Sequence, residues 1–513
     1  MKNNTHEKNM KDRILFWVDV SLIQFGVAKI LQEKIDSDFY VIYDLNHHLK
    51  KSFMQQNLVN FKKEWYFWDN IGKTKEPNIE YLKQIEKKYK INLWEIAYTE
   101  RNFYKYNPFY KFNRKEILSI FEQECRFFEK VIDEINPDFL IIKTTDFHRN
   151  YLFTEMCKAK NIKILMLSTT RLANKASIAV QSDKIDHELD EKIDDKIKIN
   201  SFEELRLYFE KRSKSHQKNM AHSGGMNYPQ YKKILPGVRW LTKTVDKKFG
   251  ESYDHYGVTR WKAISHYFSY SIKGRIRKNF IDKNFGKNID LNKKFIFFPL
   301  QVQPERNVDI DAPFYSNQIE VITNIAKALP VNCKLLVKEH PLMRYRHWRE
   351  IKEYKEIMSL PNVELIHPSI SPKEILENCK VVITIAGTTG LEAALYRKPA
   401  IVFTDTIYAS LPSVHRLRSF EELPNVIKES LEKEVKLSDV NEFINLVERN
   451  SFDFDMPDYY NKILEKFHRG GFMISTKISM KDLDKFIEED KEIYEMLSVE
   501  HIKKINQYKK LLN

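Results

Sequence analysis

The stretch KVVITIAGTTGLEAALYRKPAIVFTD, residues 380–405, decides the fold class. An apolar run over 381–385 predicts a buried strand, and the turn after it holds two glycines. Apolar residues then recur at helical spacing, and a proline precedes the apolar run AIVF. This order predicts a strand, helix and strand unit, and therefore a parallel sheet with helices packed on it.

The same alternation occurs in two separate parts of the chain. Residues 13–44 and 116–173 predict strands and helices in turn, and residues 293–415 do so again. The pattern breaks down over 181–285, and the residues after about 438 are charged and predict helices. We therefore expect an α/β protein with two doubly wound domains facing a cleft.

Four segments follow from these changes of pattern. The predicted segments are an N-terminal α/β acceptor domain (11–180), a helical and basic insertion or interdomain segment (181–285), a C-terminal nucleotide-binding domain (286–437) and a helical C-terminal tail (438–513).

Composition limits the class of protein. The 513 residues are 42% hydrophobic and 13% aromatic, which is enough for two or three cores. The net charge of +14 favours anionic partners, and the four scattered cysteines predict neither a disulfide framework nor a zinc site. With no secretory signal pattern and no apolar run of about 18 residues, we expect a location in the cytoplasm or at the inner face of the membrane.

Polar residues at strand ends are the candidate binding residues, because ligands of open α/β sheets bind at the carboxyl ends of the strands. The turn after 381–385 contains Gly387, Thr388, Thr389 and Gly390. Its glycines, hydroxyls and helix N-terminus suit a phosphate, and Glu392 could accept from ribose hydroxyls. The alternative is a helix start in which Thr389 and Glu392 form a capping box.

A second strand end has the sequence VKEHP. Lys338 and His340 follow the apolar run, and Pro341 ends the strand. A lysine and a histidine suit the phosphate of a leaving nucleotide. The alternative is a solvated cluster in which His340 caps a turn.

A third strand end, FFPLQVQPERN, brings Gln303 and Glu305 toward the same cleft, unless it is an ordinary proline-rich loop. Ser371, in SISPKEIL, is the expected N-cap of a nearby helix. Across the cleft, Asp19, Asp146 and His148 end strands of the N-terminal domain. They are the candidate bases for activating an acceptor, and plain loop roles are the alternative for each.

The segment TRWKAISHYFSYSIKGRIRKNF, 259–280, mixes basic and aromatic residues. As a helix it would place Trp261, Ile264, Phe268 and Ile272 on one side. Such a helix would suit contact with an anionic membrane. The alternative is a packed helix with solvated charge.

The motifs FPLQVQPE, VKEHP, SPKEIL and TIAGTTGLEAALYRKPAIVF together resemble the capsule polysaccharide biosynthesis glycosyltransferases, the family that includes bacterial Kdo transferases. The resemblance covers residues 293–415. It implies a GT-B fold, in which two Rossmann-like domains face a cleft and the C-terminal domain holds the sugar nucleotide. It also implies a phosphate contact by His340 and Pro341, and a donor pocket completed by Thr388, Thr389, Gly390 and Glu392.

The donor is where this chain departs from the family pattern. Kdo transferases tend to have an Asn-Ser-Thr turn and an acidic residue after the Gln-Val pair, where this chain has Ala386-Gly387-Thr388 and Glu305. An HP motif also occurs in CMP-sialic acid transferases of this fold. We therefore expect a CMP-activated acidic sugar such as CMP-Kdo first and a UDP-sugar second, with a surface or capsular glycan, free or lipid-linked, as acceptor.

No metal or cofactor is expected, because Lys338, His340 and a helix dipole could stabilise the departing phosphate. The two DxD tripeptides, at 309–311 and 453–455, lack the context of a metal site.

Other functions stay open at this point. They are a CDP-glycerol glycerophosphotransferase, which usually has an Asp-Tyr-Ser-Ser turn, a sugar-nucleotide epimerase, and a non-catalytic basic protein that binds nucleic acid or membranes. We expect no nucleic-acid partner, because such a protein would not place polar strand ends in a cleft.

Overall fold

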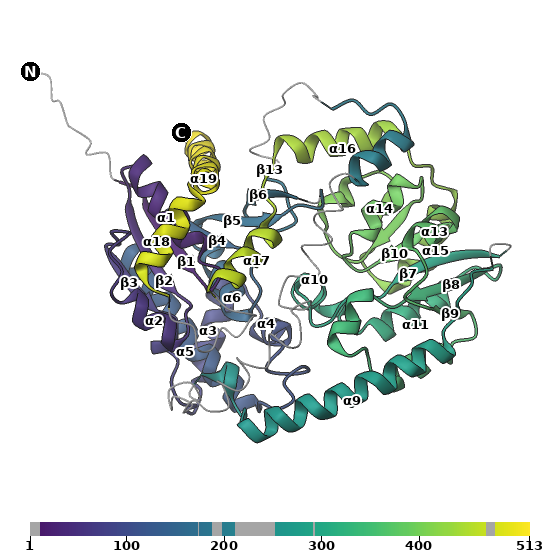
Figure 1. Cartoon of the computed structure of the whole chain (residues 1–513), viewed down its shortest axis with the longest axis horizontal. Coiled ribbons are helices and arrows are strands. Elements are labelled where there is room, and N and C mark those ends of the chain that lie inside the picture. Colours follow the sequence, from purple (N-terminus) through teal and green to yellow (C-terminus); the bar gives the residue numbers. More distant parts are fainter. Residues whose placement is uncertain are drawn as a thin grey trace, which may run out of the picture.

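The computed structural model describes residues 11–172, 174–186, 197–210, 252–290, 293–467 and 478–512. Much of the predicted interdomain segment 181–285 therefore lies outside the described residues. Two α/β domains stand side by side, and the long helix α9 (Arg260–Asn284) runs along both of them (Figure 1). Among the helices in the described ranges, none is long and apolar enough to cross a bilayer.

The N-terminal domain is built on one sheet with the strand order β13-β6-β5-β4-β1-β2-β3. Strands β1 to β5 are parallel, while β6 and β13 are antiparallel additions at one edge. The strands are β1 (Arg13–Val18), β2 (Asp38–Tyr43), β3 (Lys63–Tyr66), β4 (Phe139–Lys143), β5 (Lys163–Thr169), β6 (Lys175–Ala179) and β13 (Phe452–Asp453).

Both faces of this sheet are buried. Phe16 on β1 belongs to one hydrophobic core and its neighbour Trp17 to the other, because side chains alternate along a strand. The helices of this domain are α1 (Ile23–Lys34), α2 (His47–Phe53), α3 (Ile79–Tyr89), α4 (Leu93–Thr99), α5 (Arg114–Ile135) and α6 (His148–Ala159).

The C-terminal sheet is entirely parallel and has the order β12-β11-β10-β7-β8-β9. Its strands are β7 (Lys294–Pro299), β8 (Cys333–Lys338), β9 (Val363–Ile366), β10 (Val382–Thr384), β11 (Ala400–Val402) and β12 (Val414–Arg416). The chain builds β7, β8 and β9 outward and then returns to the other side of β7. The switch point between β7 and β10 is where open α/β sheets bind their ligands.

The helices of the C-terminal domain cover both faces of its sheet (Figure 1). They are α10 (Arg306–Asp309), α11 (Gln318–Ala328), α12 (Ile351–Met358), α13 (Pro372–Asn378), α14 (Thr389–Leu395) and α15 (Leu423–Glu432). Short 3-10 helices include η6 (Pro313–Tyr315) and η7 (Pro341–Arg346).

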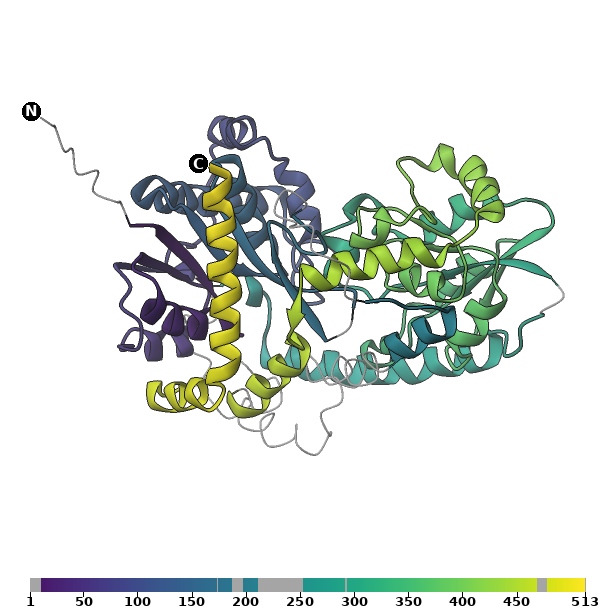
Figure 2. The ribbon, with the colours of Figure 1, turned by 90° about the horizontal axis from the view of Figure 1, so that it is seen from above.

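The predicted C-terminal tail is shared between the two domains. Helix α16 (Leu437–Arg449) packs into the C-terminal core, and β13 then joins the N-terminal sheet. The helices α17 (Met456–Phe467), α18 (Met480–Glu489) and α19 (Lys491–Leu512) pack on the N-terminal domain (Figure 2). Gly26 in α1 permits this contact, because a Cβ there would lie 2.1 Å from the Tyr494 ring. The segment is helical as predicted, but it is not a separate tail.

The molecule has two Rossmann-like domains, one with a mainly parallel sheet and one with a fully parallel sheet. A long helix joins them, and the C-terminal helices pack on the first domain. This arrangement confirms the predicted α/β fold of the GT-B type.

Candidate functional site

The three predicted strand-end motifs of the C-terminal domain lie on adjacent strands. The β7 strand stands between β8 and β10 in the sheet, so the loop at 300–305 lies between VKEHP and the glycine turn. All three strands are parallel, and their carboxyl ends meet at one edge. The sequence thus places one polar group of side chains at the switch point of this sheet.

Successive side chains of a strand point to opposite faces, so Lys338 and Glu339 at the end of β8 have different surroundings. Glu339 is fully buried and accepts from Arg349 Nε (2.9 Å) and from the Tyr354 hydroxyl (2.7 Å). Its other oxygen accepts from the backbone N–H of His340 (2.8 Å). Glu339 is therefore a structural residue that fixes the end of β8.

Lys338 has a different environment. Its exposed fraction is 4%, and within the described residues its side chain forms no hydrogen bond or ion pair. Burial lowers the pKa of the ammonium group, even though the charge of Glu339 raises it. An ammonium group with little access to water and no anion in contact is costly, so Lys338 is the one charged residue of this motif that an anionic ligand would stabilise.

His340 caps a turn, which was the alternative interpretation, and one of its ring nitrogens is still available for a phosphate contact. Its Nδ1 accepts from the backbone N–H of Leu342 (3.2 Å) at the start of η7, where Pro341 is the first residue. Burial, together with Lys338 and Arg349, lowers the pKa of His340 to about 4. The ring is therefore neutral near pH 7, and with Nδ1 accepting, its proton is on Nε2. That nitrogen is a donor suited to a phosphate oxygen.

The loop after β7 is held by its own side chains. Gln303 donates to the Ser316 carbonyl oxygen (2.8 Å) and accepts from Gln318 Nε2 (2.9 Å). Glu305 is the N-cap of α10, and burial raises the pKa of its carboxyl although Arg346, Arg171 and Arg101 lower it. Glu305 thus lies among arginines from both domains.

The glycine turn begins its helix without the capping box that was the alternative interpretation. The N-cap is Thr388, whose hydroxyl donates to Glu392 (3.2 Å), so Thr389 and Glu392 form no capping box. A Cβ at Gly390 would lie 2.7 Å from the Tyr408 ring. At Gly387 it would lie 2.7 Å from Thr384 Oγ1. Both glycines permit close packing within the protein, while Thr388 is exposed and Thr389 half-buried.

Ser371 is the N-cap of α13, as predicted from the following proline. Its side chain is exposed and makes no capping hydrogen bond. It follows β9, one strand beyond the group formed by β10, β7 and β8.

The N-terminal sheet also has a switch point, and two of the three candidate bases lie there. Lys143, at the end of β4, contacts Asp19 (3.1 Å) and Asp146 (2.8 Å). Burial raises the pKa of Asp146, but Lys143, Arg306 and Arg101 together outweigh burial, so the net pKa is lowered. Tyr460 lies beside Lys143, Asp19 and Asp146. It belongs to α17, so the C-terminal helices that pack on the N-terminal domain cover one side of these three residues.

The prediction that His148 is a base is wrong. The ring is fully buried at the start of α6, where Nδ1 contacts Glu100 (2.6 Å) and Nε2 contacts Glu124 (3.1 Å). Burial alone would lower the pKa of His148, but Glu124 and Glu100 raise it to about 9. An imidazolium with both nitrogens occupied inside a core can neither reach an acceptor nor accept a proton from it.

Arginines hold the loops on both sides of the cleft, and one of them links the two domains. Arg306, the first residue of α10, donates to the carbonyl oxygen of Thr145 (2.8 Å) in the N-terminal domain. Within the N-terminal domain Arg101 donates to the carbonyl oxygen of Asp146 (2.9 Å), and within the C-terminal domain Arg346 donates to that of Pro304 (2.7 Å). These residues are far apart in the sequence, and only the fold brings them to the cleft.

Both DxD tripeptides have protein partners. Asp309 accepts from the backbone N–H of Glu305 (2.9 Å), Asp311 pairs with Arg306 (2.5 Å), and Asp453 pairs with Lys175 (3.4 Å). In the portion of the chain that the structure describes, no three His, Cys, Asp or Glu side chains form a group that could hold a metal ion.

Comparison with known proteins identifies the region that holds the strand-end motifs. Residues 240–425 match the family model described as capsule polysaccharide biosynthesis protein. This range includes 293–415, so the match confirms the resemblance that the motifs indicated. Protein FixF of Sinorhizobium fredii is 29% identical over 123 residues, which are 23% of this chain and 29% of FixF.

The solved structures that match most of this chain have low sequence identity to it and low TM-scores. KpsC of Thermosulfurimonas dismutans, a beta Kdo 2,7 transferase, is 12% identical and is matched over 74% of this chain and 98% of its own, with a TM-score of 0.29. UDP-GlcNAc 2-epimerase of Methanocaldococcus jannaschii is 14% identical, over 89% and 99%, with a TM-score of 0.23. The fold assignment therefore rests on the strand order of the chain itself.

Proposed function

We propose that this protein is a glycosyltransferase of capsular or surface polysaccharide synthesis. The donor is a nucleotide-activated sugar, with a CMP-activated acidic sugar such as CMP-Kdo first and a UDP-sugar second. The acceptor is a glycan, free or lipid-linked. The observation that carries the proposal is Lys338, a buried ammonium group with no anionic partner in the described chain, next to a neutral His340.

The donor phosphate supplies the missing anion. Lys338 compensates its charge, and His340 donates from Nε2 to a phosphate oxygen. Both interactions strengthen when the bond to the sugar breaks and negative charge develops on the leaving nucleotide. Thr388 and Thr389 offer hydroxyls to the same donor. In this mechanism the leaving group departs without a metal ion.

The acceptor hydroxyl is deprotonated from the N-terminal side of the cleft. Asp146 is the better candidate, because its side chain is 37% exposed while that of Asp19 is 13% exposed. Asp19 Oδ1 also accepts from the hydroxyl and the backbone N–H of Ser21, and Oδ2 contacts Lys143, so both oxygens are already used. Lys143 and the contact with Arg101 hold Asp146 in place.

Thermal-shift measurements with CMP, CDP, UDP and GDP test the donor site, because a ligand that binds the folded state raises the unfolding temperature. We expect one nucleotide to stabilise the protein and the shift to vanish in His340→Ala. His367→Ala is the matched control, since His367 also follows a strand of this sheet but is occupied by Asp282 (3.1 Å) and Ser369 (2.6 Å). Four nucleotides without effect would contradict the proposal.

The product distinguishes the enzyme classes that remain. A transferase releases free nucleotide from its donor in the presence of acceptor. A sugar-nucleotide epimerase instead returns an altered sugar that is still attached to the nucleotide.

Contact with an anionic membrane is part of the proposal. On α9 the side chains of Trp261, Phe268 and Ile272 are exposed, as are the basic residues Lys262, Lys273 and Arg275. Apolar groups beside cations suit the boundary of an anionic bilayer. The fraction of protein that sediments with phosphatidylglycerol vesicles should be smaller for Phe268→Glu than for the wild type, and it should fall as salt is added. Equal sedimentation of the wild type and Phe268→Glu would exclude this contact.

A further inference from the structure

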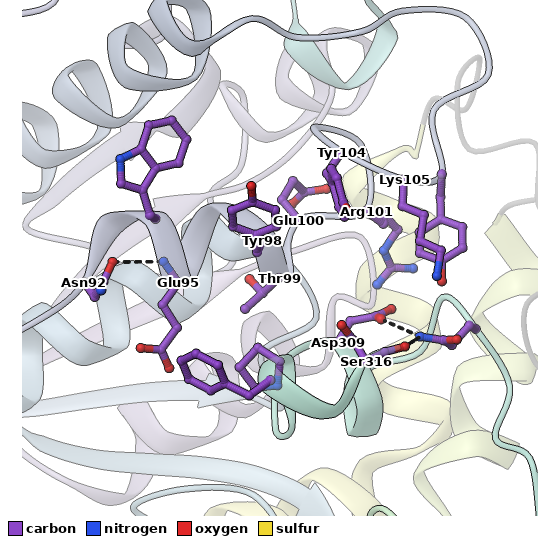
Figure 3. A pocket seen from close by; sticks show the side chains of 15 residues that line it. Asn92, Glu95, Tyr98, Thr99, Glu100, Arg101, Tyr104, Lys105, Asp309 and Ser316 are labelled. Atoms are coloured by element: carbon purple, nitrogen blue, oxygen red, sulfur yellow. Dashed lines mark hydrogen bonds between the residues drawn. The ribbon is translucent and has the colours of Figure 1, made fainter. Parts of the chain in front are cut away.

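A cavity of about 380 Å³ lies beside the strand ends, between the two domains. Helix α4 and the following residues to Tyr106 line it from the N-terminal side, and residues from Gln303 to Ser316 line it from the C-terminal side. Figure 3 shows Tyr98, Arg101 and Lys105 opposite Asp309 and Ser316. Its volume is within the range of about 300–1,000 Å³ that small-molecule sites occupy.

The sequence of α4 explains why aromatic side chains face this cavity. Asn92 caps the helix by accepting from the N–H of Glu95 (3.0 Å), which sets the helix phase. Leu93 and Ile96 are then buried, while Trp94 and Tyr98 lie one turn apart on the outer face. These two side chains are 37% and 58% exposed.

Two further exposed aromatic residues belong to the lining. Tyr104 is 65% exposed, and its ring lies edge-on to that of Tyr98 at 4.9 Å between centroids. Phe314, on η6, is 78% exposed and comes from the other domain. Single exposed aromatic residues need no explanation, but four around one cavity mark a binding surface.

Polar groups lie between these rings. Asn92, Glu95, Thr99 and Ser316 offer donors and acceptors, and Arg101 and Lys105 add positive charge. Aromatic faces pack on the C–H faces of sugar rings, while hydroxyls hydrogen-bond to amide, carboxylate and guanidinium groups at the rim. A cavity with both kinds of surface is suited to a carbohydrate.

The cavity shares residues with the candidate site. It is lined by Gln303, from the loop after β7 at the central strand end of the donor site, and by Asp309 of the following helix α10. Arg101 lines it and donates to the carbonyl oxygen of Asp146, the candidate base. A glycan held against the aromatic residues would therefore extend toward the reacting end of the cleft.

We propose that this aromatic cavity, formed by Trp94, Tyr98, Tyr104 and Phe314, binds the acceptor glycan at sugar units behind the one that receives the new residue. The inference rests on the proposed function, because it assigns the acceptor side of that reaction. It commits to an oligosaccharide chain as the occupant.

Isothermal titration of the full chain with three hexasaccharides tests the inference. Maltohexaose is neutral, chitohexaose is N-acetylated, and the α2,8-linked sialic acid hexamer is anionic. We expect at least one to bind, with an affinity at least ten-fold lower in Tyr98→Ala and in Tyr104→Ala. Trp261→Ala is the matched control, because it removes an exposed aromatic residue from α9, outside the cavity.

Each other outcome overturns the inference. One such outcome is that no hexasaccharide binds, and another is that Tyr98→Ala and Tyr104→Ala bind a hexasaccharide as tightly as the wild type. A third is that these two variants instead lose binding to a nucleotide or to an unrelated tyrosine-rich peptide. The nucleotide thermal shift is measured on the same proteins. A shift without hexasaccharide binding removes this inference alone, and hexasaccharide binding without a shift removes the proposed donor site.

Discussion

The strand ends of the two sheets have opposite electrostatic designs. At the N-terminal switch point, Lys143 is shared by Asp19 and Asp146, so each of these charged side chains has a partner of opposite sign within the protein. At the C-terminal switch point, Lys338 is buried and has no such partner in the described part of the chain. The comparison indicates that the N-terminal edge is complete as folded, whereas the C-terminal edge requires an anion from outside.

The two histidines repeat this contrast. His148 lies between two buried carboxylates, which raise its pKa to about 9. Burial, with smaller contributions from Lys338 and Arg349, lowers the pKa of His340 to about 4. A charged histidine is a stabilising part of the N-terminal core, and a neutral one is available to a ligand at the C-terminal edge.

The largest effect on folding is expected from Glu339→Ala. Glu339 is the buried partner of Arg349 and Tyr354, and its removal leaves a buried guanidinium unpaired. Breaking a buried pair in this way costs about 3–5 kcal/mol. Chemical denaturation should show the loss. Unfolding at the wild-type denaturant concentration would show that Glu339 is not the residue that fixes the end of β8.

A large effect on turnover without loss of folding is expected from Asp146→Asn. A general base contributes roughly 10²- to 10⁴-fold, so transfer from the donor should fall by about this factor while the nucleotide thermal shift stays unchanged. Asp19→Asn is the matched variant, and its transfer rate should fall less. A greater loss of transfer in Asp19→Asn would assign the base to Asp19.

A smaller effect is expected from pH, with opposite signs for the two histidines. Because the pKa of His148 is raised, its contribution to stability is fully present below about pH 6.5 and is lost as the pH rises through 9. Because the pKa of His340 is lowered, the unfolded chain takes up its proton first, and stability falls as the pH drops from 6.5 toward 4.

Denaturation across pH 4–10 measures both slopes. The loss at high pH should become shallower in His148→Gln, and the loss at low pH should become shallower in His340→Gln. Unchanged slopes in both variants would contradict the assigned protonation states.

Much of the fold could be predicted from sequence because apolar runs and helical spacing are local signals. The strand, turn, helix and strand over 380–405 were found where predicted. The return of the C-terminus could not be predicted, because an apolar helix face shows that a helix packs and does not show on which domain. Gly26 against Tyr494 is such a contact between distant segments.

The candidate site was predicted in part for the same reason. The strand-end rule identified Lys338, His340 and Asp146 as residues near the edges of the sheets, but it does not say which way a side chain turns. His148 follows a strand and nevertheless points into the core. Arg101 reaches the cleft from a turn and Arg346 from the end of η7, and only the folded chain brings them together there.

The most direct test of the central claim is Lys338→Met, measured by thermal unfolding with and without the stabilising nucleotide. Methionine fills the same space without a buried charge, so we expect the free protein to gain about 1 kcal/mol or more and the nucleotide shift to disappear. A free protein that is less stable than wild type, with an unchanged nucleotide shift, would show that Lys338 is already compensated and does not hold the donor phosphate.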